Sequence, residues 1–151
     1  MRTVTIRQPC AAPVDVVWDV ATDLEHAPEF IPGINGTEVL TDGGFGVGTR
    51  WKETRTMLGR QASEVMTITA LEPGRSYTAE ASSSGMHYVT RWEFIPVEGG
   101  SEIVMSFGGE ATGTLAKVMS KAMGFMVGSV QKTMQRDMAE LAASAERRTN
   151  T

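Results

Sequence analysis

Glu53 and Arg55 are the residues of this sequence best placed to do chemistry, because they alternate with Trp51 along one segment. Residues two positions apart in a β-strand share a face, so an inward-pointing Trp51 would carry both charged side chains into the interior. A buried pair of this kind can polarise a ligand carbonyl or hold a carboxylate. The alternative is that this face points to solvent, with Trp51 on the surface or under a loop.

Two tyrosines, Tyr77 and Tyr88, are candidates for a polar group inside an apolar pocket. A buried phenol needs either a hydrogen-bond partner in the protein or a ligand. Tyr88 alternates with Trp92 along a predicted strand, which leaves Arg91 on the opposite, outward face. Packing within a sheet explains either tyrosine equally well.

Side chains that commonly bind metals or attack substrates are sparse. His26 and His87 are the only histidines, and Cys10 is the only cysteine. We therefore expect no metal site, no cofactor and no intramolecular disulfide. Ser82 to Ser84 reads as a loop and carries no local signature of a Ser-His-Asp arrangement.

The element expected to cover these groups is one long amphipathic helix over about residues 112–147. Apolar residues recur there at steps of three and four, which is the spacing of one helical face. Met119, Met123 and Met126 form a stripe on that face. Unbranched methionine side chains fill irregular gaps, so the stripe indicates a surface that lines a ligand.

The preceding residues predict one strand, two short helices and a run of hairpins. The first strand is expected at 2–8, and the helices near 14–21 and 24–30. Glycine-containing turns then separate alternating segments at 34–40, 49–57, 61–71, 76–83, 87–95 and 101–111. This order predicts an α+β fold in which a sheet of about seven antiparallel strands curves around the long helix.

The chain length, the net charge and the lengths of the apolar runs limit the class of protein. A chain of 151 residues is most simply one domain, here 1–151. The net charge of −4 argues against nucleic acid as a partner. No apolar run is long enough to span a membrane or to form a signal peptide, so we expect a cytoplasmic protein. Gly124 and Gly128 lie off the methionine stripe, and a homodimer contact is one explanation for them.

Several short motifs follow one another in a characteristic order. They are Ala12-Pro13-Val-Asp-Val-Val17-Trp18, Asp23-Leu-Glu-His-Ala-Pro28-Glu-Phe30-Ile-Pro32-Gly33, Val47-Gly48-Thr49, Leu71-Glu72-Pro73, Trp92-Glu-Phe94 and Gly99-Gly100-Ser101. Together they resemble the START-like or Bet v 1-like (SRPBCC) superfamily, and within it the polyketide cyclase/dehydrase and lipid-transport group. The resemblance implies a helix-grip fold and a deep cavity between sheet and long helix that binds lipids, hormones or polyketides. Some members are enzymes, and fold alone does not settle function.

The aromatic polyketide cyclases of this family resemble one another in a pocket arginine and a tryptophan four residues ahead of it. The corresponding positions here fall at Val65 and Thr69, so both residues are missing. This departure favours binding over catalysis of that type.

We therefore expect a protein that binds a small apolar molecule, lipid-like or polyketide-like, between the sheet and the C-terminal helix. The expected ligand-binding residues are Phe30, Trp51, Tyr77, Tyr88, Trp92, Met119, Met123 and Met126. The alternative is a cyclase or dehydratase acting on a carbonyl-rich chain, with Arg55 and Glu53 as the candidate catalytic residues.

Overall fold

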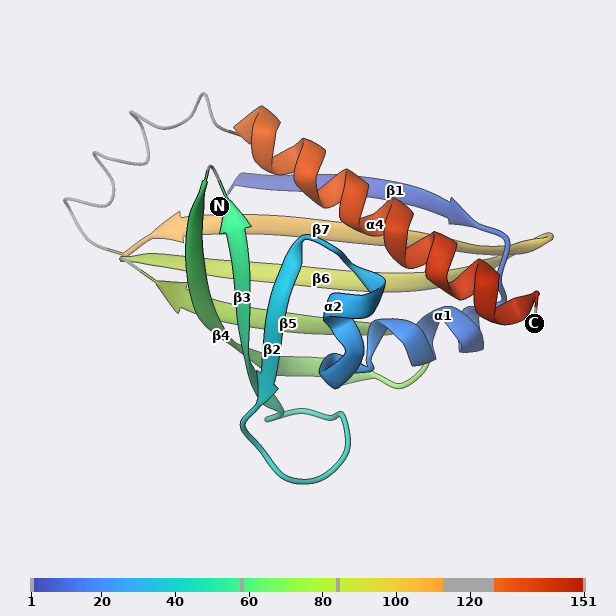
Figure 1. Ribbon diagram of the computed structural model, residues 1–151, viewed down its shortest axis with the longest axis horizontal. Coiled ribbons are helices and arrows are strands. Elements are labelled where there is room, and N and C mark those ends of the chain that lie inside the picture. The colour runs from blue at the N-terminus through green and yellow to red at the C-terminus, as the bar shows by residue number, and fades with distance from the viewer. Residues whose placement is uncertain (1, 58, 84, 113–126, 151) are drawn as a thin grey trace.

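The computed structural model describes residues 2–57, 59–83, 85–112 and 127–150. Seven strands form one antiparallel sheet, and the helices lie against one of its faces (Figure 1). The strands are β1 (Arg2–Cys10), β2 (Ile34–Val39), β3 (Arg50–Met57), β4 (Arg60–Glu72), β5 (Ser76–Ser83), β6 (Met86–Val97) and β7 (Gly100–Ala111). The helices are α1 (Val14–Ala21), the 3-10 turn η1 (Leu24–His26), α2 (Ala27–Phe30) and α4 (Val127–Thr149).

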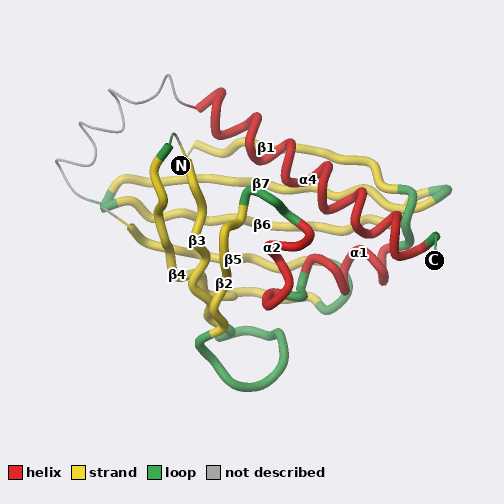
Figure 2. Tube along the Cα trace, in the orientation of Figure 1, coloured by secondary structure: helices red, strands yellow, loops and turns green. Residues whose placement is uncertain are grey.

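The sheet has the order β1-β7-β6-β5-β4-β3-β2, so the hairpins from β3 to β7 lie side by side. Irregular pairing between Ile68 and Ala70 interrupts β4, the longest strand. Such bulges bend a strand and increase its twist. In Figure 2, β2 and β3 consequently run at a steep angle to β6 and β7. The predicted helix-grip architecture, with its curved sheet and two short helices after the first strand, is confirmed.

The hairpin turns contain glycine where the backbone requires it. Gly59 between β3 and β4 has φ +77°, and Gly74 between β4 and β5 has φ +75°. A side chain is disfavoured in this left-handed region. One turn was placed too early from the sequence: Pro96 and Val97 continue β6, and Val97 pairs with Gly100.

The long helix encloses the core together with α1. Apolar side chains of α4 at steps of three and four are fully buried, namely Met138, Leu141, Ala142 and Ala145. They pack in one cluster with Val17 and Val20 of α1 and with Ile103 of β7. This spacing is what buries one face of a helix against a sheet.

The predicted helix over 112–147 is confirmed in its C-terminal part. Thr112 is not helical, α4 is described from Val127, and it continues to Thr149. Met119, Met123 and Met126 lie outside the described residues, so their predicted role stays a prediction. No helix among the described residues is long and apolar enough to cross a membrane.

Candidate functional site

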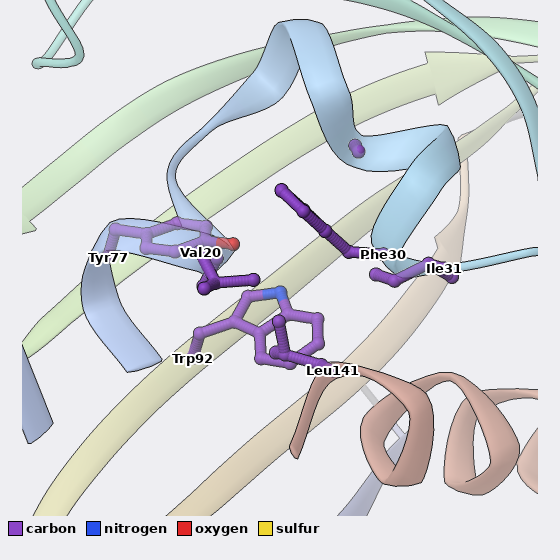
Figure 3. Close-up of a pocket in the computed structure, with 8 residues that line it drawn as sticks. Val20, Phe30, Ile31, Tyr77, Trp92 and Leu141 are labelled. Carbon is purple, nitrogen blue, oxygen red and sulfur yellow. The ribbon is translucent and has the colours of Figure 1, made fainter. Parts of the chain in front are cut away.

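A small cavity lies between the sheet and the helices α1, α2 and α4 (Figure 3). Its volume is about 30 Å³, which is room for roughly one or two water molecules. It is lined by Val20 and Ala21 of α1, Ala27 and Phe30 of α2, Ile31, Tyr77 of β5, Trp92 of β6 and Leu141 of α4. The walls therefore come from elements at both ends of the chain.

Aromatic rings hold the floor of this cavity in place. Tyr77 and Trp92 are partners across β5 and β6, and their rings stack with centroids 6.3 Å apart. Trp18 and Phe45 meet the Tyr77 ring edge-on at 6.1 Å and 5.2 Å. Edge-to-face contacts at these separations are favourable beyond the area they bury. Phe45 comes from the glycine-rich loop (residues 40–49) between β2 and β3, which packs against the floor from outside the cavity lining.

Both polar atoms of that floor point into the cavity. Figure 3 shows the Tyr77 oxygen and the Trp92 indole nitrogen directed into the space beneath Phe30. Within the described residues neither group has a side-chain hydrogen bond, and neither polar atom is completely shut off from solvent. Burial, and secondarily the charge of Glu53, raises the pKa of Tyr77, so the phenol keeps its proton and remains a donor at neutral pH.

A second group of polar side chains lies on the same face of the sheet, on β3. Trp51 is only 5% exposed, so this face points inward and carries Glu53 and Arg55 with it. Arg55 Nε donates to Glu53 Oε2 at 2.8 Å, and Arg55 Nη1 donates to Asp137 Oδ2 of α4 at 2.6 Å. Trp51 Nε1 donates to Glu53 Oε1 at 3.5 Å. We call Glu53, Arg55 and Asp137 the ion-pair cluster.

The ion-pair cluster carries more negative than positive charge. Burial lowers the pKa of Arg55, but the charges and hydrogen bonds of Glu53 and Asp137 outweigh it, and the pKa rises above its ordinary value. Burial raises the pKa of Asp137, because lost hydration outweighs the attraction of Arg55. Two carboxylates facing one guanidinium leave Arg55 already neutralised, so the arrangement disfavours a ligand carboxylate.

The surroundings of the ion-pair cluster are close-packed and acidic. A Cβ on Gly33 would lie 3.1 Å from Asp137 Oδ1, which is closer than most Cβ contacts, so glycine favours this close approach of the loop before β2. Glu64 of β4 lies directly opposite Glu53 in the strand register. Burial, followed by the charge of Glu53, raises the pKa of Glu64. The interior face of β3 and β4 therefore disfavours additional negative charge.

The residues predicted from the sequence are distributed over three places. Phe30, Tyr77 and Trp92 line the cavity, whereas Trp51 packs in the core beside the ion-pair cluster. Tyr88 stacks on Phe107 with centroids 5.8 Å apart and is not among the residues lining the cavity. The predicted inward orientation of Trp92 and outward orientation of Arg91 agree with their exposure.

Sequence reasoning missed Asp137, which was not assigned to any site. Its position four residues before Leu141 was a usable signal, because that spacing places it on the buried face of the helix. The positions compared with the cyclase tryptophan and arginine lie on the outer face of the sheet. Val65 is 38% exposed and Thr69 is exposed, so neither side chain of β4 faces the cavity.

A separate hydrogen-bonded chain lies on the outer face of the sheet. Ser82 Oγ lies 2.9 Å from His87 Nδ1, and His87 Nε2 lies 2.8 Å from Glu80 Oε1. These side chains connect β5 to β6 and alternate with the inward residues of both strands. Within the described ranges, no group of three or more potential metal ligands is found.

Comparisons with known proteins show the family and the fold of this chain. The model of a family described as polyketide cyclase / dehydrase and lipid transport matches residues 1–146. The Zhui aromatase/cyclase from Streptomyces sp. R1128 is 20% identical with a TM-score of 0.76, covering 98% of this chain and 95% of its own. No curated protein matches the sequence.

Two further solved structures share the fold. A protein from Thermus thermophilus is 21% identical with a TM-score of 0.72, over 97% of this chain and 96% of its own. The ginseng major latex-like protein 151 from Panax ginseng is 14% identical with a TM-score of 0.76, over 95% of this chain and 97% of its own. At these identities the likeness shows a common fold.

Proposed function

The chain belongs to the polyketide cyclase / dehydrase and lipid transport family, and from this premise we propose that it binds a small hydrophobic ligand between the sheet and the C-terminal helix. The observation that carries the proposal is the cavity closed by α1, α2 and α4, with two polar atoms directed into it. A mostly apolar concave site with a few convergent polar groups is the usual form of a small-molecule site.

The ligand enters by displacing part of the cavity wall, because about 30 Å³ is too small for a drug-sized molecule. Of the helices and strands that line the cavity, α2 is the shortest, at four residues. Its Phe30 lies beneath the Arg148 guanidinium at 5.6 Å from the ring centroid. Movement of Phe30 exposes apolar surface, and ligand burial recovers roughly 25 cal/mol per Å² before the costs of association.

Titration of tryptophan fluorescence with fatty acids, sterols and polyketide-like aromatic compounds tests the proposal. We expect saturable binding of at least one class by the wild type. Ala21→Leu adds volume inside the cavity and is expected to weaken that binding at least about tenfold by steric exclusion. Ala139→Leu, at an exposed position of α4, is the matched control. The absence of saturable binding by all three classes would overturn the proposal.

A second candidate is a cyclase or dehydratase acting on a carbonyl-rich chain, favoured by the inward-facing ion-pair cluster. In such a reaction Arg55 would polarise a carbonyl, and Asp137, whose pKa is raised by burial, would transfer a proton. Turnover of a poly-β-ketone thioester by wild type, Arg55→Ala and Arg55→Lys tests this. Enzyme function requires loss of turnover in folded Arg55→Ala, and unchanged turnover in that variant would remove the candidate.

A further inference from the structure

The cavity presents hydrogen-bond donors against walls that have no polar side-chain atoms. An indole N–H can only donate, and a phenol can donate or accept. Apart from Tyr77 and Trp92, the lining side chains are those of valine, alanine, phenylalanine, isoleucine and leucine. Figure 3 shows the two polar atoms directed into the same space. One oxygen with two lone pairs, such as that of a carbonyl, can accept a hydrogen bond from both donors.

The two donors are held before any ligand arrives. Tyr77 is 6% exposed, and its ring contacts Trp18, Phe45, Trp92 and Phe94 with centroids 5.2 to 6.4 Å apart. Trp92 also stacks on Phe94 at 6.4 Å. Tyr77 and Trp92 are direct partners in the β5–β6 ladder, and their rings stack on each other, so the sheet and the ring contacts hold the two side chains side by side. Preorganised donors lose little freedom when an acceptor binds.

The charge around the cavity selects among oxygen acceptors. Asp137 lies one helical turn from the cavity residue Leu141 on the same face of α4. The charge of Glu53 also acts on Tyr77 directly. Arg55 is neutralised by its two carboxylate partners, so the ion-pair cluster has a net negative charge and repels a carboxylate or phosphate on its side of the cavity. Arg148 lies over Phe30 on the α2 side, 5.6 Å from the ring centroid. An uncharged carbonyl is not repelled by the ion-pair cluster.

The geometry points to Tyr77 and Trp92 as a two-donor site for one uncharged carbonyl oxygen, so that the ligand is a ketone, ester or amide on an apolar body. This inference rests on the proposed binding function and narrows it to a ligand class. The cavity receives the carbonyl end, and the apolar remainder of the ligand occupies space opened by displacement of the α2 wall.

Three probes of similar size test separately whether the site requires an acceptor and whether it rejects a negative charge. Acetophenone carries a carbonyl, ethylbenzene carries no acceptor, and benzoate carries a negative charge. Their dissociation constants are measured by calorimetry and ligand-observed NMR on the full chain. Tyr77→Phe removes one hydroxyl and keeps the ring, and Trp92→Phe removes the indole N–H. Tyr88→Phe makes the same chemical change as Tyr77→Phe at a tyrosine outside the cavity lining.

We expect the wild type to bind acetophenone about tenfold more tightly than ethylbenzene, and benzoate most weakly. Tyr77→Phe should weaken acetophenone binding about threefold to tenfold and leave ethylbenzene binding within about twofold. Equal affinities for acetophenone and ethylbenzene would overturn the donor site and leave the proposed function standing. An equal loss in Tyr88→Phe, or preference for benzoate, would also overturn it. Failure of every probe to bind would overturn the donor site, whereas the proposed function fails only if fatty acids, sterols and polyketide-like aromatic compounds also do not bind.

Discussion

The guanidinium of Arg55 lies 2.6 Å from the carboxylate of Asp137, a contact that joins β3 to the C-terminal helix across 82 residues of chain. The Asp137 side chain is 8% exposed, so this charge has little access to water. The same arginine holds Glu53 at 2.8 Å. The contact fixes the position of α4 over the part of the sheet next to the cavity.

Removal of one partner of this contact is expected to lower the stability of the folded protein. Asp137→Ala leaves Arg55 half-compensated in a buried position, and we expect the free energy of unfolding to fall by about 3 kcal/mol. Urea denaturation measures it. Gln135→Ala, at an exposed position on the same helix, should change stability by less than about 0.5 kcal/mol. A loss in Asp137→Ala no larger than in this control would show that the contact contributes nothing.

Close packing at Gly33 gives a second prediction. A methyl group there would lie 3.1 Å from Asp137 Oδ1, so in Gly33→Ala the carboxylate must shift by a few tenths of an ångström, and its contact with Arg55 is disturbed. We expect a destabilisation of about 1 to 2 kcal/mol. Gly36→Ala is the control, since a Cβ at Gly36 meets nothing within 4 Å. Thermal unfolding of both variants gives the comparison, and equal melting temperatures would contradict the packing argument.

The environment of Glu64 predicts a stability difference that depends on pH. Burial, followed by the charge of Glu53, raises the pKa of Glu64 in the folded protein. As pH rises from below the ordinary glutamate pKa, the unfolded chain releases this proton first, so ionisation reduces folding stability. Glu64→Gln cannot ionise and should therefore be more stable than wild type at pH 7.5, with the difference shrinking toward pH 4.5.

The control for Glu64 is Glu98→Gln in the exposed β6–β7 turn, which removes the same charge from the surface. Urea denaturation at both pH values gives the free energies of unfolding. If Glu64→Gln were less stable than wild type at pH 7.5, the ionised carboxylate would be contributing favourably and the argument from burial would be wrong.

The glycine-rich loop is attached to the floor of the cavity by one side chain. Phe45 contacts Trp18 at 6.1 Å and Tyr77 at 5.2 Å. We expect Phe45→Ala to lower the free energy of unfolding by about 1 to 2 kcal/mol and to speed amide hydrogen exchange over residues 40–49. Val47→Ala, at a side chain that is 66% exposed, should change neither. Unaltered exchange in Phe45→Ala would show that the loop is held by other contacts.

Much of the fold was predictable because its signals are local. Pro13 precedes α1, and Gly59 and Gly74 stand in tight turns with positive φ, as turn chemistry requires. Alternation along β6 placed Trp92 inward, and Phe94, two positions further on the same face, is 1% exposed. These features depend on residues within a few positions of one another, so one sequence is sufficient to infer them.

The site was less predictable because its contacts are between distant segments. The orientation of Trp51 depends on how β3 pairs in the sheet, and alternation alone allows both faces. The partner of Arg55 on α4 is set by where the helix crosses the sheet. Phe45 lies between glycines in a turn-rich stretch of the sequence, yet tertiary packing places it against Tyr77. No local pattern encodes any of these three relationships.

The central claim is that a small apolar ligand occupies the cavity beneath Phe30 and contacts the indole nitrogen of Trp92. The indole N–H signals of Trp18, Trp51 and Trp92 in a ¹⁵N-correlated NMR spectrum report on three different places, and Trp92→Phe assigns the relevant one. On titration with acetophenone we expect a saturable shift of the Trp92 signal larger than that of Trp51, whose N–H already faces Glu53. No saturable shift at Trp92, or equal shifts at all three indoles, would contradict the account.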